Sequence, residues 1–160
     1  MSSVDWVDPQ AIRFKITPQD GLRGIVGGDW DLTNRQALET APKHRSIVQR
    51  YVQCWPWEQT DLFKNIYAKR IGRESIRGCN TMRELVAQYY ERVDGMFEDM
   101  KSHGFRLGGQ LPKFLIGRDG QVFIGNQGNH RLAMAHILKL PRVAGEILCR
   151  HSLFIAERAA

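Results

Sequence analysis

The sequence is poor in cysteine and contains no long hydrophobic run. Among its 160 residues, Cys54, Cys79 and Cys149 lie far apart and form no Cys-x-x-Cys pair. This spacing argues against a zinc knuckle or a disulfide framework, and it favours three structural thiols in a reducing compartment. No stretch approaches the ~18 consecutive apolar residues that a transmembrane helix needs. Neither a membrane-spanning protein nor a small disulfide-stabilised one is therefore expected.

Targeting segments and repeats are also missing from the sequence. The N-terminal residues have neither the basic start nor the apolar stretch of a signal peptide, which predicts a cytoplasmic protein with no membrane partner. The chain has no internal repeat and no low-complexity segment. Its length of 160 residues and its 42% of hydrophobic residues are sufficient for a folded core. The sequence thus predicts a single domain over residues 1–160.

The composition carries a modest excess of positive charge. The 23 Lys and Arg residues outnumber the 17 Asp and Glu residues, which gives a formal net charge of +6. This balance favours anionic partners such as nucleotides, phosphates or nucleic acid, but it is too small to establish one of them. One basic run can contact a nucleic-acid backbone, although a solvated surface is the more common outcome. That run comprises Lys69, Arg70, Arg73 and Arg77.

The first part of the chain, residues 1–77, predicts short strands followed by a helical elaboration. Residues 11–16 alternate apolar and basic side chains, which indicates a half-exposed strand, and residues 22–26 predict a second one. Helical spacing appears before Pro56 and resumes after Thr60, which is a candidate N-cap. This part therefore supplies strands first and helices afterwards.

Residues 78–150 predict a helix followed by a β-rich core. Thr81 and Glu84 have the spacing of a capping box at a helix N-terminus, and Gly104 suits the C-terminal end. Apolar residues recur every three or four positions between these ends. Because Gly95 weakens the middle of this segment, we expect a kink or two consecutive helices there.

A hairpin, a second helix and a last strand complete this core. Two short β runs at residues 113–116 and 121–124 are separated by the turn sequence Gly-Arg-Asp-Gly. A glycine-containing loop then leads into a helical run rich in Ala and Leu over residues 131–139. Residues 143–148 predict the last strand, and residues 151–160 are expected to form a C-terminal tail.

The loop before the second helix carries the strongest chemical signal. Gly125 and Gly128 let the backbone turn sharply and approach a ligand closely. The helix N-terminus that follows offers unpaired N–H groups and a positive dipole end to an anion. Arg131 can grip phosphate oxygens by two parallel hydrogen bonds, and His130 can donate to a phosphate or shuttle a proton near neutral pH. The alternative is a plain strand-to-helix turn with an exposed His-Arg pair.

The order of these elements resembles the ParB/sulfiredoxin superfamily. A helix, a hairpin over residues 113–124, the box Gly-Asn-His-Arg at 128–131, a small-residue helix and a Leu-Pro turn follow one another. The resemblance covers roughly residues 81–150. It implies an α/β (α+β) fold with a small mixed sheet flanked by helices. It also implies a nucleotide ligand (ATP, ADP or CTP) with its phosphates held by Asn126, Gln127, Gly128, Asn129, His130 and Arg131.

Two positions depart from the pattern of that family. Asn129 stands where sulfiredoxins carry a cysteine, so the reduction of a sulfinic acid is not expected. Gln127 stands where kinase-like members often carry an aspartate. Either a catalytic base comes from elsewhere in the chain, or the domain binds a nucleotide without catalysis.

The first part of the chain offers a candidate for that base. Asp29 and Asp31 follow two glycines after a predicted strand. Their carboxylates can hold Mg²⁺ together with nucleotide phosphates, or one of them can accept a hydroxyl proton. In the free-serine kinases of the resembling family, an acidic residue of the N-terminal region is the base, which is compatible with this position. The alternative is that either aspartate caps the next helix.

Three functional hypotheses follow from these signals. The first is nucleotide-dependent phosphoryl transfer or NTP hydrolysis with Mg²⁺, in which Asp29, Asp31 and His130 are the catalytic candidates and the two aspartates are also the candidate metal ligands. The second is a non-enzymatic module that binds a nucleotide or DNA and regulates a partner. A nuclease ranks last, because the sequence has no cluster of carboxylates with a basic residue at nuclease-like spacing.

Overall fold

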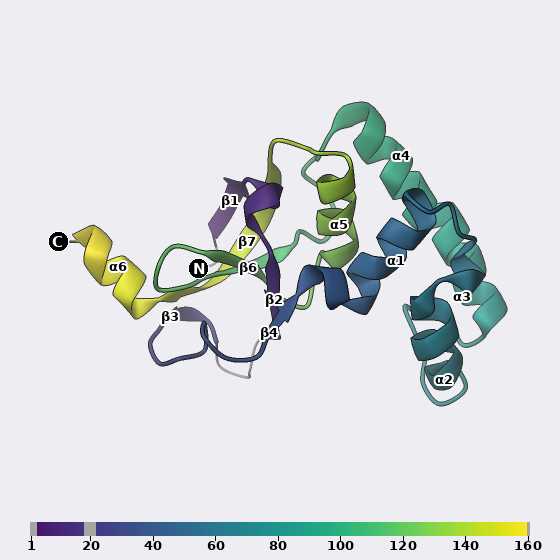
Figure 1. Cartoon of the computed structure of the whole chain (residues 1–160), viewed down its shortest axis with the longest axis horizontal. Coiled ribbons are helices and arrows are strands. Elements are labelled where there is room, and N and C mark those ends of the chain that lie inside the picture. The colour runs from purple at the N-terminus through teal and green to yellow at the C-terminus, as the bar shows by residue number, and fades with distance from the viewer. Residues whose placement is uncertain (1–2, 18–21, 160) are drawn as a thin grey trace.

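The structure is a computed structural model that describes residues 3–17 and 22–159. Within these residues the chain forms a mixed seven-stranded sheet accompanied by helices (Figure 1). The strands are β1 (Ser3–Val7), β2 (Phe14–Ile16), β3 (Gly24–Val26), β4 (Arg35–Ala37), β5 (Lys113–Ile116), β6 (Val122–Ile124) and β7 (Val143–His151). The predicted α/β class is confirmed.

The longest strand, β7, organises the sheet. The strand order is β1-β7-β5-β6-β2-β4, and β5 lies parallel to β7 along one edge. Along the other edge, β1 pairs antiparallel with residues 143–147, and β3 pairs in parallel with residues 149–151. The β5–β6 hairpin agrees with the prediction, whereas β7 continues three residues beyond the expected end.

The helices are spread over most of the chain. The α-helices are α1 (Pro42–Tyr51), α2 (Ala68–Arg70), α3 (Met82–Gln88), α4 (Asp94–His103), α5 (Asn129–Ile137) and α6 (Ser152–Ala159). Two π-helical segments, Leu62–Tyr67 and Tyr89–Val93, precede α2 and α4. Short 3-10 turns lie at Pro9–Ala11, Leu38–Thr40 and Trp57–Gln59. None of the described helices is long and apolar enough to cross a membrane.

Helix α5 lies between the sheet and the helices α1 and α4 (Figure 1). It packs against α1 and α4, and Figure 1 shows α2 and α3 at the end of the molecule opposite to α6. The main core fills the space between these layers, with Phe114 from the sheet, Leu132 from α5 and Trp57 and Tyr89 from the helical part all essentially inaccessible to water. The N-terminus of α5 is thereby fixed from several sides.

The capping residues of the long helical segment are confirmed. The Thr81 hydroxyl accepts the N–H of Glu84, and Gly104 has a φ of +72° at the end of α4. The interruption, however, is the π-helical segment at 89–93, and Gly95 lies inside α4. The wider turn places both Tyr89 and Val93 in the core, so packing decides where the helix changes.

An acidic residue anchors the helical part from within. Asp94 accepts hydrogen bonds from three side chains, namely Arg50, Tyr51 and Trp57. The distances from its carboxylate are 2.7 Å to Arg50 Nη2, 2.7 Å to Tyr51 Oη and 3.0 Å to Trp57 Nε1. These contacts tie α1 and the segment around Trp57 to the first residue of α4.

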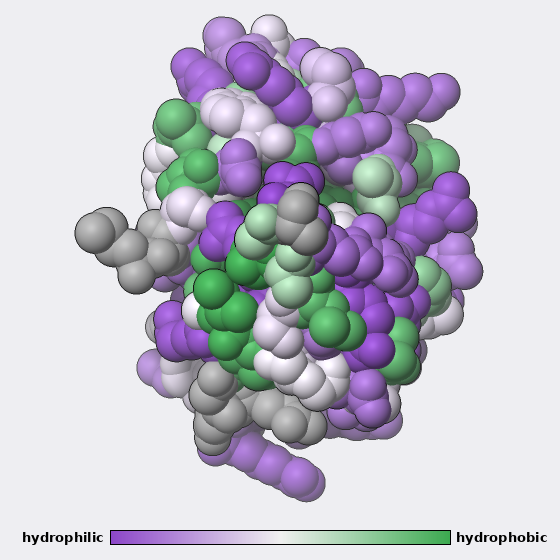
Figure 2. Space-filling model, turned by 90° about the vertical axis from the view of Figure 1, so that its left-hand side faces the viewer, coloured by the Kyte–Doolittle hydropathy of each residue, from purple (hydrophilic) through white to green (hydrophobic). Residues whose placement is uncertain are grey.

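The expected C-terminal tail contains α6. This helix buries none of its residues completely and contacts β3 and β7. Figure 2 looks at this end of the molecule and shows apolar and polar surface side by side. Ile25 and Leu153 are the large exposed apolar residues of β3 and α6. Of the three free thiols, Cys79 and Cys149 are buried, as expected of structural thiols, and Cys54 is exposed.

Candidate functional site

A pocket of about 790 Å³ opens where the N-terminus of α5 faces α4 and the beginning of α1. We call it the α5 pocket. Its volume lies within the range of small-molecule sites, roughly 300–1,000 Å³. All six residues predicted to bind nucleotide phosphates line it, namely Asn126, Gln127, Gly128, Asn129, His130 and Arg131. Its other walls comprise Lys43, Arg77, Val93, Met96, Asp99, Met100 and residues 106–110.

Glycine is required at the start of α5. Gly128 is the N-cap, with a left-handed φ of +88°. A Cβ at this position would lie 2.4 Å from the Cα of Pro112, so no other residue fits without a shift of the backbone. Because glycine has no side chain to cap the helix, the first N–H groups of α5 receive no side-chain cap and stay available to a ligand.

Three cations of the α5 pocket, Lys43, Arg77 and Arg131, have no acidic partner among the described residues, and Arg131 donates to backbone carbonyls instead. The ion pairs of the described chain involve other side chains, so Lys43 and Arg77 bring uncompensated positive charge to the pocket. The pKa of Lys43 is lowered, first by partial burial of its amine and then by the charges of Lys15, Arg77 and Arg70. An anion bound here would stabilise the charged amine and so raise the pKa of Lys43 again.

Backbone geometry holds Arg77 in place. Arg77 and Gly78 both have positive φ, and hydrogen bonds of 2.9 and 2.8 Å between Ile76 and Cys79 close the turn around them. A left-handed conformation is uncommon for a residue other than glycine. The guanidinium donates to the Gln88 side chain at 2.8 Å from its Nε. The turn thus presents a fixed cation at the wall of the pocket.

His130 is a neutral group in this structure. Its Nε2 lies 2.9 Å from the hydroxyl of Tyr89, which in turn lies 2.6 Å from the hydroxyl of Tyr67. Burial, together with the charges of Arg77 and Lys43, lowers the pKa of His130 to about 3. At neutral pH the imidazole can therefore donate or accept a hydrogen bond, but it does not titrate there as the predicted proton shuttle would.

Arg131 holds a wall of the α5 pocket together. Its Nη2 donates to the carbonyl of Arg106 at 2.8 Å, and its Nη1 donates to the carbonyls of Gly108 at 3.3 Å and Gln110 at 3.2 Å. The guanidinium also lies over the ring of Phe105, 4.0 Å from its centroid. These contacts differ from the predicted two-bond grip on phosphate and fix the loop opposite the α5 N-terminus.

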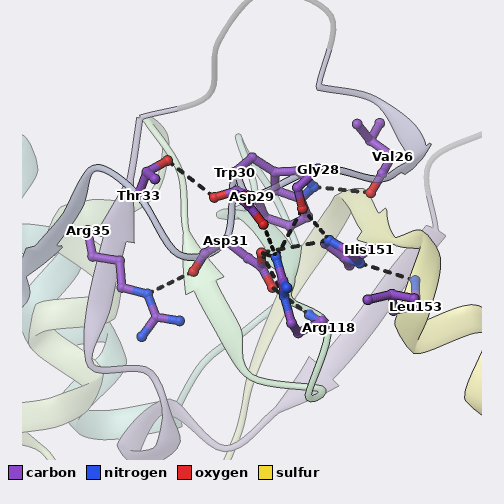
Figure 3. Close-up of polar contacts among 10 residues, drawn as sticks. All are labelled: Val26, Gly28, Asp29, Trp30, Asp31, Thr33, Arg35, Arg118, His151 and Leu153. Atoms are coloured by element: carbon purple, nitrogen blue, oxygen red, sulfur yellow. Dashed lines mark hydrogen bonds and ion pairs between the residues drawn. The ribbon is translucent and has the colours of Figure 1, made fainter.

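The two predicted catalytic aspartates lie at a different place, beside the turn of the β5–β6 hairpin (Figure 3). Neither Asp29 nor Asp31 lines the α5 pocket. Asp31 is 1% exposed and accepts hydrogen bonds from the backbone N–H of Arg118 at 2.8 Å and from its guanidinium at 2.8–3.2 Å. Asp29 is largely exposed and meets the same guanidinium at 3.0 Å.

A histidine completes this group, which we call the aspartate cluster (Asp29, Asp31, Arg118 and His151). The His151 Nε2 donates to the carbonyl of Gly28 at 2.7 Å, and its Nδ1 accepts the N–H of Leu153 at 3.1 Å. This pattern assigns a neutral imidazole protonated at Nε2. The cluster therefore joins the loop at 28–31, the hairpin turn and the first turn of α6.

The aspartate cluster does not suit the predicted base or Mg²⁺ ligands. Burial alone would raise the pKa of Asp31, but the hydrogen bonds and charge of Arg118 lower it to about 2. A carboxylate with so low a pKa is a weak proton acceptor. Arg118 occupies both its oxygens, and the described residues contain no group of three His, Cys, Asp or Glu side chains that could hold a metal ion. The residues present thus do not fit Mg²⁺.

The lining of the α5 pocket includes a single carboxylate among the residues described. Asp99 is already paired with Arg106, and its Oδ1 lies 3.3 Å from Nδ1 of His103. Asp99 therefore offsets the charge of Arg106, and the positive charges of Lys43 and Arg77 have no carboxylate partner in the described lining.

Three cations of the α5 pocket are not predicted as site residues by the sequence. Lys43 and Arg106 stand in segments with no motif, and Arg77 is expected in a surface run. The pair Arg77-Gly78 is a turn signal that could have placed Arg77 at a fixed bend. No local pattern marks Lys43, because the packing of α1 on α5 brings it to the pocket.

Comparison of the chain with family models, curated proteins and solved structures finds no match. The ParB/sulfiredoxin resemblance therefore stays a prediction that rests on residues 81–150.

Proposed function

We propose that this protein binds a nucleotide in the α5 pocket. The phosphates would lie at the N-terminus of α5, between Lys43 and Arg77, and the base would lie against the apolar side chains of Met96 and Met100 on α4. One observation carries this proposal: two cations without acidic partners converge on a helix N-terminus that has no side-chain cap. It agrees with what the family resemblance implies for residues 126–131.

We infer a binding module rather than a phosphoryl-transfer enzyme. The predicted base, Asp31, lies outside the α5 pocket and has a low pKa. The carboxylate of the pocket itself, Asp99, is paired with Arg106. His130 is neutral and is held by Tyr89, so it supplies a hydrogen bond rather than a charge. These groups are suited to hold phosphates and not to activate a nucleophile.

The direct test is calorimetric titration with ATP, ADP, CTP and GTP, each with and without Mg²⁺. Lys43→Met keeps the length of the side chain and removes its charge. A lost charge-assisted hydrogen bond of about 1.5–3 kcal/mol corresponds to roughly 10- to 150-fold weaker binding. Lys101→Met, an exposed change on α4 outside the pocket lining, is the matched control and should bind as the wild type does.

Two results would overturn the proposal in different ways. If none of the four nucleotides binds, or if Lys43→Met binds as tightly as Lys101→Met, the α5 pocket is not a nucleotide site. If nucleotides bind and are then hydrolysed, with phosphate released in a steady-state assay, the protein is an enzyme. In that case the α5 pocket is a nucleotide site as proposed, and the inference of a binding module without catalysis is wrong.

A further inference from the structure

A chain of three hydrogen-bonded side chains leads from the helical part of the molecule to the α5 pocket. The hydroxyl of Tyr67 lies 2.6 Å from that of Tyr89, which lies 2.9 Å from Nε2 of His130. All three side chains are buried, with Tyr67 3%, Tyr89 0% and His130 8% exposed. Of the three, His130 is the one that lines the pocket. The chain therefore connects the core to a group that a ligand can reach.

The other ring nitrogen of His130 is free to meet that ligand. Its Nδ1 has no hydrogen-bond partner among the described residues. Of the side-chain polar atoms in the described part of the chain, Nδ1 of His44 is the one that protein atoms enclose without a partner, so Nδ1 of His130 keeps access to the pocket. A buried side chain with an unpartnered nitrogen at a pocket indicates a group that binds a ligand.

The number of acceptors sets the direction of the hydrogen bonds along this chain. Among the described residues, the hydroxyl of Tyr67 has no acceptor other than the oxygen of Tyr89, so it donates to Tyr89. The hydroxyl of Tyr89 then donates to Nε2 of His130. The reverse direction would leave the buried O–H of Tyr67 without an acceptor, which is unfavourable. A neutral imidazole that accepts at Nε2 carries its proton on Nδ1, at the pocket.

The other groups assigned to the phosphate at this end of the pocket are donors as well. The N–H of Leu132 is bonded within the helix to the carbonyl of Gly128 at 3.0 Å, so the N–H groups of residues 129–131 precede the hydrogen bonds of α5. Lys43 and Arg77 add two cations from the walls. These groups satisfy oxygens that accept hydrogen bonds, and they offer no acceptor to an oxygen that carries a proton.

We propose that Tyr89 fixes His130 as an Nδ1–H donor and that the α5 pocket therefore binds the terminal phosphate of a nucleotide as its dianion. This inference rests on the proposed nucleotide site and specifies the form of the ligand that it takes. A dianionic phosphate monoester presents three oxygens that only accept hydrogen bonds, whereas its monoanion carries a proton that needs an acceptor. Tyr89 is a positioning residue, because it acts on the ligand through His130.

The first test measures the affinity of ATP, ADP, CTP and GTP by calorimetry between pH 5 and pH 7, without Mg²⁺. Because a phosphate monoester has a second pKa of about 6, its dianionic fraction rises from about one-tenth to about nine-tenths over this range. We expect the affinity to rise roughly 10-fold with that fraction. If Nδ1 were an acceptor, the protonated phosphate would be preferred and the affinity would fall.

A second set of nucleotides separates the titration of the ligand from that of the protein. These carry fluorine in place of one oxygen of the terminal phosphate, which then keeps a single negative charge over the whole range. The charged and titratable groups that face the pocket or His130 act on both sets in the same direction, namely Lys43, Arg77, Tyr89, Asp99, Arg106 and Arg131. The ratio of the two affinities therefore reports the dianion alone, and we expect it to rise with pH.

The third measurement locates the proton on His130. NMR spectra of the protein with isotope-labelled histidine distinguish Nδ1–H from Nε2–H in a neutral ring, and we expect Nδ1–H. Tyr89→Phe removes the hydroxyl that fixes this tautomer, so it should give a mixture of the two forms and remove most of the preference for the unfluorinated nucleotide. Tyr51→Phe removes a tyrosine hydroxyl that donates to Asp94 outside the pocket lining, and this control should change neither result.

Each other result has a defined meaning. An Nε2–H tautomer in the wild type, or an affinity ratio that does not change with pH, makes the inference wrong and leaves the nucleotide site standing. If Tyr89→Phe keeps both the tautomer and the preference, or if Tyr51→Phe loses them equally, Tyr89 does not position His130. If Tyr89→Phe fails to fold, the wild-type spectrum and the fluorinated nucleotides decide. If none of the four nucleotides binds, the proposed function and this inference both fail.

Discussion

Replacing Asp31 by asparagine tests whether this residue is catalytic or structural. In the structure its carboxylate is 1% exposed and receives the backbone N–H and the guanidinium of Arg118. Asparagine keeps the shape but removes the charge, and it turns one acceptor oxygen into an NH₂ group that faces a cation. A structural role therefore predicts a loss of stability and no direct effect on ligand binding.

The pKa of Asp31 sets the magnitude. A carboxyl group whose pKa falls from 3.8 to about 2 on folding contributes about 2 kcal/mol to the free energy of unfolding at neutral pH. This contribution is complete above pH ~4 and is lost as the pH falls through 2, because the folded state then binds the proton that the unfolded state already holds. Adding the repulsion between the new NH₂ and Arg118 brings the expected cost of Asp31→Asn to about 2–4 kcal/mol.

Thermal unfolding and urea titration measure this change. For a chain of 160 residues, a loss of about 2–4 kcal/mol lowers the melting temperature by roughly 5–15 °C. The difference between wild type and Asp31→Asn should shrink as the pH is lowered from 5 to 2. Asp29→Asn, an exposed change at the same guanidinium, is the control and should leave the melting temperature almost unchanged.

A stable Asp31→Asn would refute the reasoning. If the variant melts with the wild type at pH 7 while nucleotide turnover falls by two orders of magnitude or more, Asp31 is the base that the sequence predicts. A cost that is independent of pH would show that Arg118 does not stabilise the ionised carboxylate. Unchanged affinity for nucleotide in a destabilised variant is the outcome we expect.

Three further predictions concern other parts of the fold. Gly128→Ala should lower the melting temperature strongly, because the positive φ and the contact with Pro112 exclude a Cβ; a stable variant in a thermal scan would contradict this. The imidazole of His130 should stay neutral down to pH 5 in an NMR titration. A titration midpoint near 6.5 would show that the ring is exposed to solvent rather than buried. Asp94→Ala leaves three side-chain donors without their acceptor and should cost about 3–5 kcal/mol in urea unfolding, and a cost below 1 kcal/mol would show that water replaces the carboxylate.

Sequence reasoning works best where function and local structure coincide. Gly128 is needed for the left-handed cap of α5, and the proposed approach of the backbone to a ligand requires the same residue type. Thr81 and Glu84 are a purely structural case, because their spacing reflects hydrogen bonds within one turn of a helix. In each case the interacting groups are close in sequence, which is why their pattern predicts the geometry.

The aspartates show the limit of such reasoning. Two carboxylates after a pair of glycines resemble a metal or base site, and nothing nearby in the sequence contradicts this. The group that determines their chemistry is Arg118, 87 residues away from Asp31. The sequence assigns Arg118 only to a hairpin turn, and it assigns His151 only to a tail. The ion pair appears only when the sheet brings the hairpin to the loop.

In the α5 pocket, too, partners that are distant in the sequence decide which side chains are available to a ligand. Arg131 was expected to hold phosphate because its residue type and position suit that task, yet its donors are directed to the carbonyls of the loop at 106–110. Among the described residues, Lys43 forms no ion pair and Arg77 donates to the neutral side chain of Gln88, and the sequence predicts neither cation as a site residue. A permanent cation in a motif is available to a ligand only if the fold gives it no other partner. The pattern of unpaired charge, rather than the motif alone, therefore identifies the residues whose substitution should change binding.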